Sequence, residues 1–229
     1  MSRLLLVEDD DDIGARLQAQ FEQHHHTVVW ARNGATSILE AADGEFDLIL
    51  LDLGLPDLHG FDVCRALRSA QPGSVLVILT ASMEEVDVIV SLEAGADDYI
   101  TKPFRTAELL ARLRAHLRRR SAAGSVAPRL RVGALDIDGS IRDAHVHGRS
   151  LDLPAKEFDI LVRLATQPGM TISRATLIAD VWGHAFTGTP KNLDVHVSAL
   201  RRRLAEAADP AQPGPRIVTV RGRGYRLEI

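Results

Sequence analysis

Cysteine is nearly absent from this chain, because Cys64 is the only one among 229 residues. One thiol excludes an intramolecular disulfide and is consistent with a reducing compartment. Long apolar runs are missing as well: none approaches the ~18–20 residues that a membrane-spanning helix needs. A strand pattern begins directly after Met1-Ser2-Arg3, which leaves no room for a signal peptide. We therefore expect a soluble cytoplasmic protein that does not bind a membrane.

Aromatic residues are scarce at 4%, whereas hydrophobic residues as a whole reach 45%. This predicts cores built from Leu, Val, Ile and Ala, and the length suffices for two domains. Charge is divided unevenly, because residues 1–120 carry 12 Lys/Arg and 20 Asp/Glu while residues 121–229 carry 15 and 11. An acidic half joined to a basic half predicts a metal or regulatory site in the first and a polyanion partner for the second.

The first half alternates apolar strand patterns with helix-period segments five times. Strands are predicted near 3–7, 27–31, 48–51, 75–80 and 98–101, and helices near 13–24, 34–42, 61–69, 84–94 and 106–119. Strict alternation of this kind predicts an α/β domain with a doubly wound parallel sheet and helices on both faces. Cys64 falls in the third helical segment, where we expect an inert thiol.

Five polar residues each close one of these apolar runs. They are Glu8, Asp9, Asp52, Thr80 and Lys102. The carboxyl ends of parallel strands share one crevice, so these side chains are expected to meet there. Three crowded carboxylates need a cation, and an all-oxygen set favours Mg²⁺. The hydroxyl and the ammonium can then hold an anion, most simply a phosphoryl group on an aspartate. The plainer alternative is that the carboxylates only solvate loop ends.

The pattern changes after residue 120. Residues 121–128 are small and aperiodic, which predicts a linker between a domain at 1–120 and one at 129–229. Residues 130–153 read as an antiparallel meander, helices are predicted at 155–167, 173–182 and 190–205, and a hairpin with a Gly222 turn closes the chain. Three helices followed by a basic-tipped hairpin outline an α+β winged helix.

Four segments of the first half resemble the receiver domain of bacterial response regulators. They are Leu6–Asp10, Asp47–Pro56, Leu79–Ala81 and Gly95–Phe104. The resemblance covers roughly residues 1–120 and implies a five-stranded sheet of order 2-1-3-4-5. It implies that Asp52 is the phosphoacceptor.

The resemblance also assigns roles around that aspartate. Asp9, Asp52 and the carbonyl of Gly54 would bind Mg²⁺, with Glu8 acting mainly through coordinated water. Lys102 would pair with the phosphoryl oxygens, Thr80 would hydrogen-bond to them, and Tyr99 would rotate inward as that hydroxyl moves. Neutralising the repulsion between a carboxylate and a phosphoryl group would let the protein catalyse its own phosphorylation.

An Mg²⁺-dependent phosphatase is an alternative from a different class. Such enzymes generally carry a second aspartate two positions after the nucleophile, where this chain has Gly54. Without a positioned acid or base, the acyl phosphate should turn over slowly, which suits a signal and not a metabolic enzyme.

The second half resembles the winged-helix effector domain of the OmpR/PhoB class. The matching segments include Leu153–Leu161, Ile172–Leu177, Val181–Gly183, Leu193–Leu204 and Val218–Arg226. Leu193, Val197, Leu200 and Leu204 fall on one helical stripe, which we expect to be buried. The rest of that helix and the hairpin would contact double-stranded DNA. The predicted DNA-contacting residues are Lys191, Asn192, His196, Ser198, Arg201, Arg202, Arg203, Thr219, Arg221 and Arg223.

Several residues of this half carry a second interpretation. A basic helix can be a solvated surface, and His196 can touch phosphate or pack locally. We interpret Asp194 as an orienting partner for a nearby arginine, and Trp182 as core rather than a DNA contact. Ser198 stands where relatives often place arginine, so the DNA sequence preference cannot be carried over. Residues 184–189 resemble the region that meets RNA polymerase in this class.

A homodimer of the phosphorylated receiver is expected through residues 84–94, 98–101 and 106–119. The predicted interface residues are Ile89, Leu92, Asp97, Asp98, Glu108, Arg112 and Arg119. Val88 stands where relatives have a cation opposite Glu108, so one ion pair is missing and the dimer should be weaker.

These inferences predict a DNA-binding transcriptional response regulator, phosphorylated on Asp52 by a sensor histidine kinase and dimerising on tandem DNA half-sites. The runner-up is a DNA-binding protein whose unphosphorylated receiver serves as a constitutive dimer module.

Overall fold

A computed structural model describes residues 1–81, 90–92, 94–107, 109–114, 116–117, 129–183, 191–208 and 214–229. The chain divides into two compact units, Met1–Leu117 and Arg118–Ile229. Among the described residues, no helix is long and apolar enough to cross a membrane.

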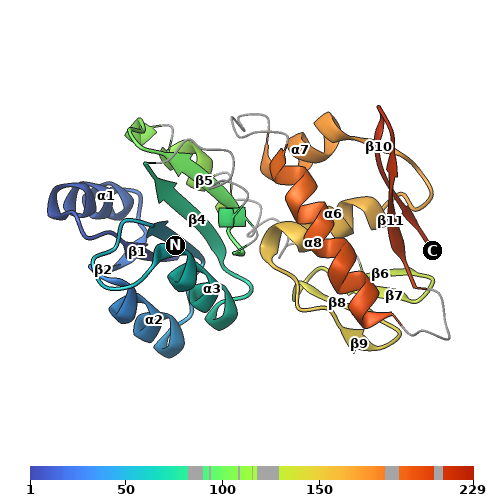
Figure 1. Ribbon diagram of the computed structural model, residues 1–229, viewed down its shortest axis with the longest axis horizontal. Coiled ribbons are helices and arrows are strands. Elements are labelled where there is room, and N and C mark those ends of the chain that lie inside the picture. Colours follow the sequence, from blue (N-terminus) through green and yellow to red (C-terminus); the bar gives the residue numbers. More distant parts are fainter. Residues whose placement is uncertain are drawn as a thin grey trace. The chain divides into compact units, whose positions relative to one another are not determined.

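The first unit contains a five-stranded parallel sheet of order β2-β1-β3-β4-β5 (Figure 1). Its strands are β1 (Arg3–Val7), β2 (Thr27–Ala31), β3 (Leu48–Asp52), β4 (Val75–Thr80) and β5 (Asp98–Thr101). The predicted strand order is confirmed. Because the order reverses next to β1, the carboxyl ends of β1 and β3 open one crevice.

Helices cover both faces of this sheet. They are α1 (Asp11–Gln23), α2 (Gly34–Asp43), α3 (Gly60–Ala70) and helical residues within 106–117. One core packs α1 and residues 109–117 on β1, β3 and β4, and the other packs α2 and α3 on the opposite face. Cys64 lies in the second core and is fully buried, and burial raises its thiol pKa to about 12, as expected for an inert thiol.

Polar caps explain where two helices begin. The Asp10 carboxylate accepts hydrogen bonds from the backbone N–H groups of Asp12 and Ile13 at 2.9 Å each. This cap starts α1 two residues before the apolar period that predicted it. Asn33 caps α2 in the same way through the Thr36 N–H at 2.8 Å.

A buried arginine ties α3 to the segments around β4 and β5. Arg68 Nη2 lies 2.6 Å from Asp97 Oδ2, and both side chains are shielded from solvent. Its remaining N–H groups donate to backbone carbonyls of Gln71, Pro72, Ser74 and Gly95. Asp97 also accepts a hydrogen bond from the Leu76 N–H at 2.8 Å, so the Arg68–Asp97 pair is bound to the beginning of β4.

Replacing Arg68 with alanine is expected to destabilise the first unit by about 3–5 kcal/mol, because Asp97 would stay buried without its cation. Hydrogen exchange followed by mass spectrometry measures this loss in β4, with peptides of α6 in the second unit as an internal reference. Arg65→Ala on the same helix is the control, because its pair with Asp62 is exposed and contributes about 0.2–1 kcal/mol. Equal protection in the two variants would contradict the assignment.

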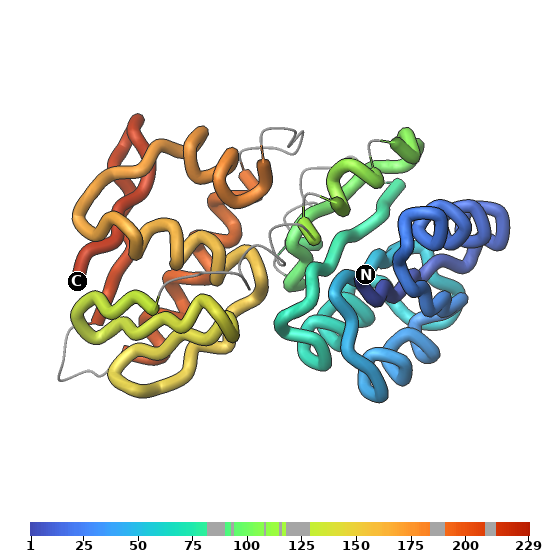
Figure 2. Tube along the Cα trace, turned by 180° about the vertical axis from the view of Figure 1, so that it is seen from behind, coloured from blue at the N-terminus to red at the C-terminus, as the bar shows by residue number. Residues whose placement is uncertain are grey.

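In its described residues, the second unit comprises two antiparallel sheets and three helices, and Figure 2 traces it in yellow to red. The strands are β6 (Arg129–Val132), β7 (Leu135–Asp138), β8 (Asp143–Val146), β9 (Arg149–Ser150), β10 (Ile172–Ser173), β11 (Arg216–Val220) and β12 (Gly224–Glu228). The helices are α6 (Ala155–Ala165), α7 (Arg174–Trp182) and α8 (Lys191–Ala207). Strands β6 to β9 form the predicted meander, and β10-β12-β11 form a second sheet.

The short strand β10 was not predicted. It pairs with β12 at Gly224, where an added Cβ would lie 1.9 Å from the carbonyl oxygen of Ile172. The missing side chain is therefore what lets the two backbones approach.

The expected buried stripe of α8 is confirmed. Leu193, Val197, Leu200 and Leu204 are each at most 2% exposed and join the core of the second unit. Trp182 belongs to the same core, as predicted.

Candidate functional site

The first candidate site lies at the carboxyl ends of β1 and β3. Carboxylate oxygens of Glu8, Asp9 and Asp52 lie within 4.8 Å of one another. Glu8 is fully buried, Asp52 is 7% exposed and Asp9 is exposed. The structure thus brings together the three carboxylates that the strand ends predicted.

Lys102 supplies the cation of this cluster from the end of β5. Its Nζ donates to Asp52 Oδ2 at 2.8 Å and to Glu8 Oε2 at 2.9 Å. Burial raises the pKa of Glu8 to about 7, the charge of Asp52 adds to the rise, and the hydrogen bond from Lys102 opposes it. Burial lowers the pKa of Lys102, but its bonds to Asp52 and Glu8 outweigh this and raise it.

The donor set fits a hard divalent cation. All three side chains of the cluster offer carboxylate oxygens, and when Glu8 is ionised the one ammonium leaves net negative charge. The backbone of Gly54 adjoins the site, since a Cβ there would lie 3.5 Å from Asp52 Oδ2. These residues satisfy the chemistry that Mg²⁺ requires.

The two predicted switch residues follow neighbouring strands. Thr80 ends β4, one residue after the position that pairs with Asp52, and is 6% exposed. Tyr99 lies in β5, half-buried against the core that contains α3. Arg112 Nη1 donates to its carbonyl at 3.3 Å.

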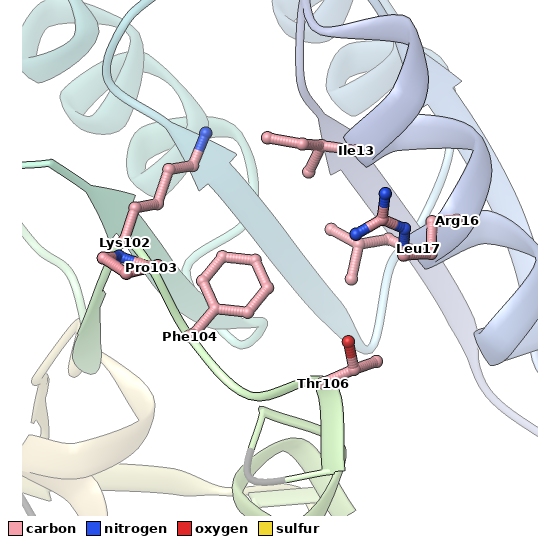
Figure 3. A pocket seen from close by; sticks show the side chains of 7 residues that line it. All are labelled: Ile13, Arg16, Leu17, Lys102, Pro103, Phe104 and Thr106. Atoms are coloured by element: carbon pink, nitrogen blue, oxygen red, sulfur yellow. The ribbon is translucent and has the colours of Figure 1, made fainter.

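A pocket of about 390 Å³ opens beside Lys102, between α1 and the chain that follows β5. Figure 3 shows Phe104 facing Ile13 and Leu17 of α1 across it. Arg16 on α1 is exposed at its edge. The pocket is mostly apolar and sits next to the ammonium that contacts Asp52.

Three of the predicted dimer residues are buried in the single chain. Asp97 is fully buried against Arg68, and Asp98 is 1% exposed with its Oδ2 3.3 Å from His116 Nε2 and 3.6 Å from Arg112 Nη1. Both acids are therefore engaged within their own chain, and their part in a dimer stays a prediction. Leu92 is 4% exposed and so offers little apolar surface in the single chain.

Some predictions fall outside the described residues. They concern Val88, Ile89, Glu108, Arg119, the linker 121–128 and the loop 184–189.

The second candidate site is the exposed face of α8. Lys191, Ser198 and Arg202 are exposed and recur at helical spacing along this face. They lie opposite the buried stripe, which leaves one side of α8 open to a ligand. An α-helix of this width fits the major groove of DNA.

Two predicted contacts on α8 are wrong. Asn192 is fully buried, and His196 is 2% exposed with its ring centroid 5.6 Å from that of Trp182. Both residues are buried, because they lie four residues apart on the side of α8 that borders the buried stripe and not on its exposed face. For His196, local packing is thus the correct alternative.

The side chain of Arg203, which was also predicted to contact DNA, is bound within the second unit. Its Nη1 donates to the carbonyl of Asp152 at 2.8 Å, and its Nε lies 3.0 Å from Glu157 Oε2 on α6. Arg201 instead ties α8 to β11 through the Ile217 carbonyl and the Thr219 hydroxyl, at 2.8 and 2.7 Å.

Asp194 orients an arginine, as predicted. Its Oδ2 accepts from Arg174 Nη2 at 2.6 Å, and its Oδ1 accepts from the Tyr225 hydroxyl. Burial raises the pKa of Asp194, but these two hydrogen bonds outweigh it and hold the pKa below its usual value. The carboxylate links α7, α8 and β12 and is therefore committed to the fold.

The hairpin of β11 and β12 carries cations at its tip. Arg221 and Arg223 are exposed on either side of Gly222, whose φ of +70° allows the tight turn. Thr219 is exposed on β11. The tip thus presents two guanidinium groups within a narrow turn, as a groove-contacting wing requires.

Both units match known protein families. The response regulator receiver domain matches residues 4–114, and the C-terminal domain of transcriptional regulatory proteins matches residues 148–227. Sensory transduction protein RegX3 of Mycobacterium tuberculosis is 39% identical over 230 residues, covering all of both chains. Transcriptional regulatory protein PrrA of the same species is 40% identical over 229 residues, covering 99% of this chain and 96% of its own. The chain is a two-component response regulator of the OmpR/PhoB class.

Two solved structures align with nearly the whole chain of this response regulator. A cysteine-to-serine mutant of RitR has a TM-score of 0.81 at 26% identity, covering 99% of each chain. DrrB of Thermotoga maritima, described as an OmpR/PhoB homolog, has a TM-score of 0.52 at 30% identity and covers all of both chains. Response regulators with this effector domain bind DNA and are not metabolic enzymes.

Sequence reasoning missed two features of the response regulator's site. One is the direct pairing of Lys102 with Glu8, 94 residues away. The other is Trp30 in β2, whose indole reaches the carbonyl of Glu8. No local pattern signals either contact, because both partners come together only when the sheet assembles.

Proposed function

We propose that the response regulator is switched by phosphorylation of Asp52 and that the switch controls its occupancy of tandem DNA half-sites. The observation that carries this proposal is the cluster of Glu8, Asp9 and Asp52, in which Glu8 and Asp52 contact the ammonium of Lys102. A carboxylate at the end of a strand, beside a fixed ammonium, is placed to receive a phosphoryl group.

In the proposed reaction, an Asp52 oxygen attacks phosphorus while the bond from phosphorus to the donor breaks, and the donor leaves with that electron pair. Lys102 and Thr80 hold the phosphoryl oxygens, so charge developing in the transition state meets a fixed ammonium and hydroxyl. Glu8, Asp9, Asp52 and the Gly54 carbonyl would hold Mg²⁺, which would supply positive charge against the repulsion between nucleophile and phosphoryl group.

Incubation with acetyl phosphate tests the proposal. Intact-mass spectrometry is expected to show one phosphoryl group in the presence of Mg²⁺ and none in EDTA. Sustained release of phosphate would support the phosphatase alternative instead. A protein that stays unphosphorylated yet binds DNA as a dimer would favour the constitutive dimer module.

The partner that donates the phosphoryl group is proposed to be a sensor histidine kinase. We assign its contact to the pocket beside Lys102, because that pocket is lined by the lysine that contacts Asp52 and Arg16 offers a charge at the rim. The other proposed partners are double-stranded DNA, which the effector domain would bind, and RNA polymerase, which would be contacted in transcription.

Phosphotransfer is measured from a kinase that phosphorylates the wild type. Replacing Arg16 with glutamate is expected to slow this transfer about tenfold or more, since reversing a charge at an interface mainly lowers the association rate. Phosphorylation by acetyl phosphate should be unchanged, because the small donor needs no docking surface. Radiolabelled transfer kinetics measure both rates. Equal slowing with both donors would place the effect at the acidic site and not at docking.

We propose that the phosphorylated protein dimerises. This part of the proposal does not depend on ion pairs from Asp97 and Asp98 to a partner subunit, because both carboxylates already pair within their own chain. Two DNA-binding units in one dimer raise their effective concentration on adjacent half-sites. Sedimentation with beryllofluoride and Mg²⁺ is expected to show a dimer, and an unchanged monomer would remove this part of the proposal.

A further inference from the structure

Trp30 lies beside the acidic site without belonging to it. It is half-buried in the edge strand β2, in register with Leu6 of β1. Its indole extends past the end of β1 and donates through Nε1 to the backbone carbonyl of Glu8 at 2.8 Å. The N–H of the same glutamate donates to the Ala31 carbonyl at 3.1 Å. Both polar groups of the Glu8 backbone are therefore held by β2.

A fixed Glu8 carbonyl also fixes the next residue. The peptide bond is planar, so the direction of that carbonyl determines the direction of the Asp9 N–H and the path of the chain into Asp9. On the other side, Asp10 is anchored as the cap of α1 through two hydrogen bonds of 2.9 Å. Asp9 itself is exposed, so its place near Asp52 depends on these two neighbouring anchors.

The indole is held in turn by its surroundings. A Cβ on Gly14 of α1 would come within 2.0 Å of the ring, so only glycine lets the ring lie against this helix. The guanidinium of Arg32 stacks on the ring, 4.1 Å from its centroid, and pairs with Asp11 at 2.8 Å. A ring clamped in this way can direct its N–H at one carbonyl only.

We propose that Trp30 is a positioning residue of the acidic site: its indole N–H holds the Glu8–Asp9 peptide so that Asp9 faces Asp52, and this sets the affinity for Mg²⁺. The inference rests on the proposed function, in which these carboxylates bind the cation. Groups that orient metal ligands typically change metal affinity by about 10- to 100-fold when they are lost.

Substituting Trp30 with 3-benzothienylalanine tests the proposal in the full-length chain. This side chain keeps the shape of tryptophan but replaces the N–H with sulfur. Calorimetric titration with MgCl₂ is expected to give a dissociation constant about tenfold higher than that of the wild type. The midpoint of thermal unfolding without Mg²⁺ should change little, because packing on Gly14 and Arg32 is retained.

A second readout uses the wild type. The indole N–H resonance of Trp30 is expected to shift on addition of Mg²⁺, because the N–H donates to the carbonyl of Glu8, a residue of the proposed metal site. The dissociation constant fitted to this shift should equal the one found by calorimetry. Trp30→Phe should weaken Mg²⁺ binding in the same direction.

Each outcome decides a different point. Wild-type affinity in the benzothienyl variant would overturn the role of Trp30 and leave the proposed function intact. A wild type that binds no Mg²⁺ would overturn both. Weaker binding at an unchanged unfolding midpoint would establish the positioning role, which general destabilisation does not produce.

Discussion

Replacing Asp52 with asparagine is expected to abolish covalent phosphorylation by acetyl phosphate. The amide has the size of the carboxylate but lacks the negative oxygen that attacks phosphorus. It also removes one of the three charges that gather a cation, so Mg²⁺ binding should weaken at the same time. Intact-mass spectrometry detects the phosphoryl group directly, and calorimetry measures the cation.

Asp57→Asn is the matched control for this variant. Asp57 lies five residues further along, and its two oxygens accept the N–H groups of Gly34 and Ala35 at 2.8 and 2.9 Å. These bonds hold the pKa of Asp57 below its usual value and commit it to the start of α2. The control should therefore be phosphorylated like the wild type. A phosphoryl group on the Asp52→Asn protein would show that another side chain is the acceptor.

Removing both cations of the hairpin tip is expected to have the second large effect, on DNA binding. A plot of log affinity against log salt concentration has a negative slope. In an Arg221→Ala/Arg223→Ala protein, the magnitude of this slope should decrease by about 1.8, because each lost phosphate contact removes about 0.9. Fluorescence anisotropy over a salt series, on a DNA fragment selected from a random pool, measures this slope.

Arg149→Ala is the control for charge alone. Arg149 is an exposed cation of β9, in the meander and not in the hairpin. Its removal changes the net charge without touching the proposed wing, so the salt slope should stay within about 0.5 of the wild-type value. An equal fall of the slope in both proteins would mean that the hairpin makes no specific contact. The buried residues Asn192 and His196 would not serve as tests, because their replacement disturbs the core.

Much of the fold could be predicted because it depends on local pattern. Aliphatic runs of strand length separated by helical periods predicted β1, β2, β4 and β5 at their observed bounds. The acidic site followed from the same pattern, since parallel strands bring their carboxyl ends together. Helix ends were less accurate, because a cap such as Asp10 extends a helix beyond its apolar period.

The sequence by itself determined which strands form in the parallel sheet and which polar residues close them, because aliphatic content and period act within a few residues. Only the tertiary structure decided which polar side chains are buried. A polar group can be buried when a partner satisfies it, and that partner is often distant along the chain. Asp97 pairs with Arg68, 29 residues away, and the Glu8 carboxylate pairs with Lys102, 94 residues away. Residue type alone therefore could not tell a surface acid from a buried one.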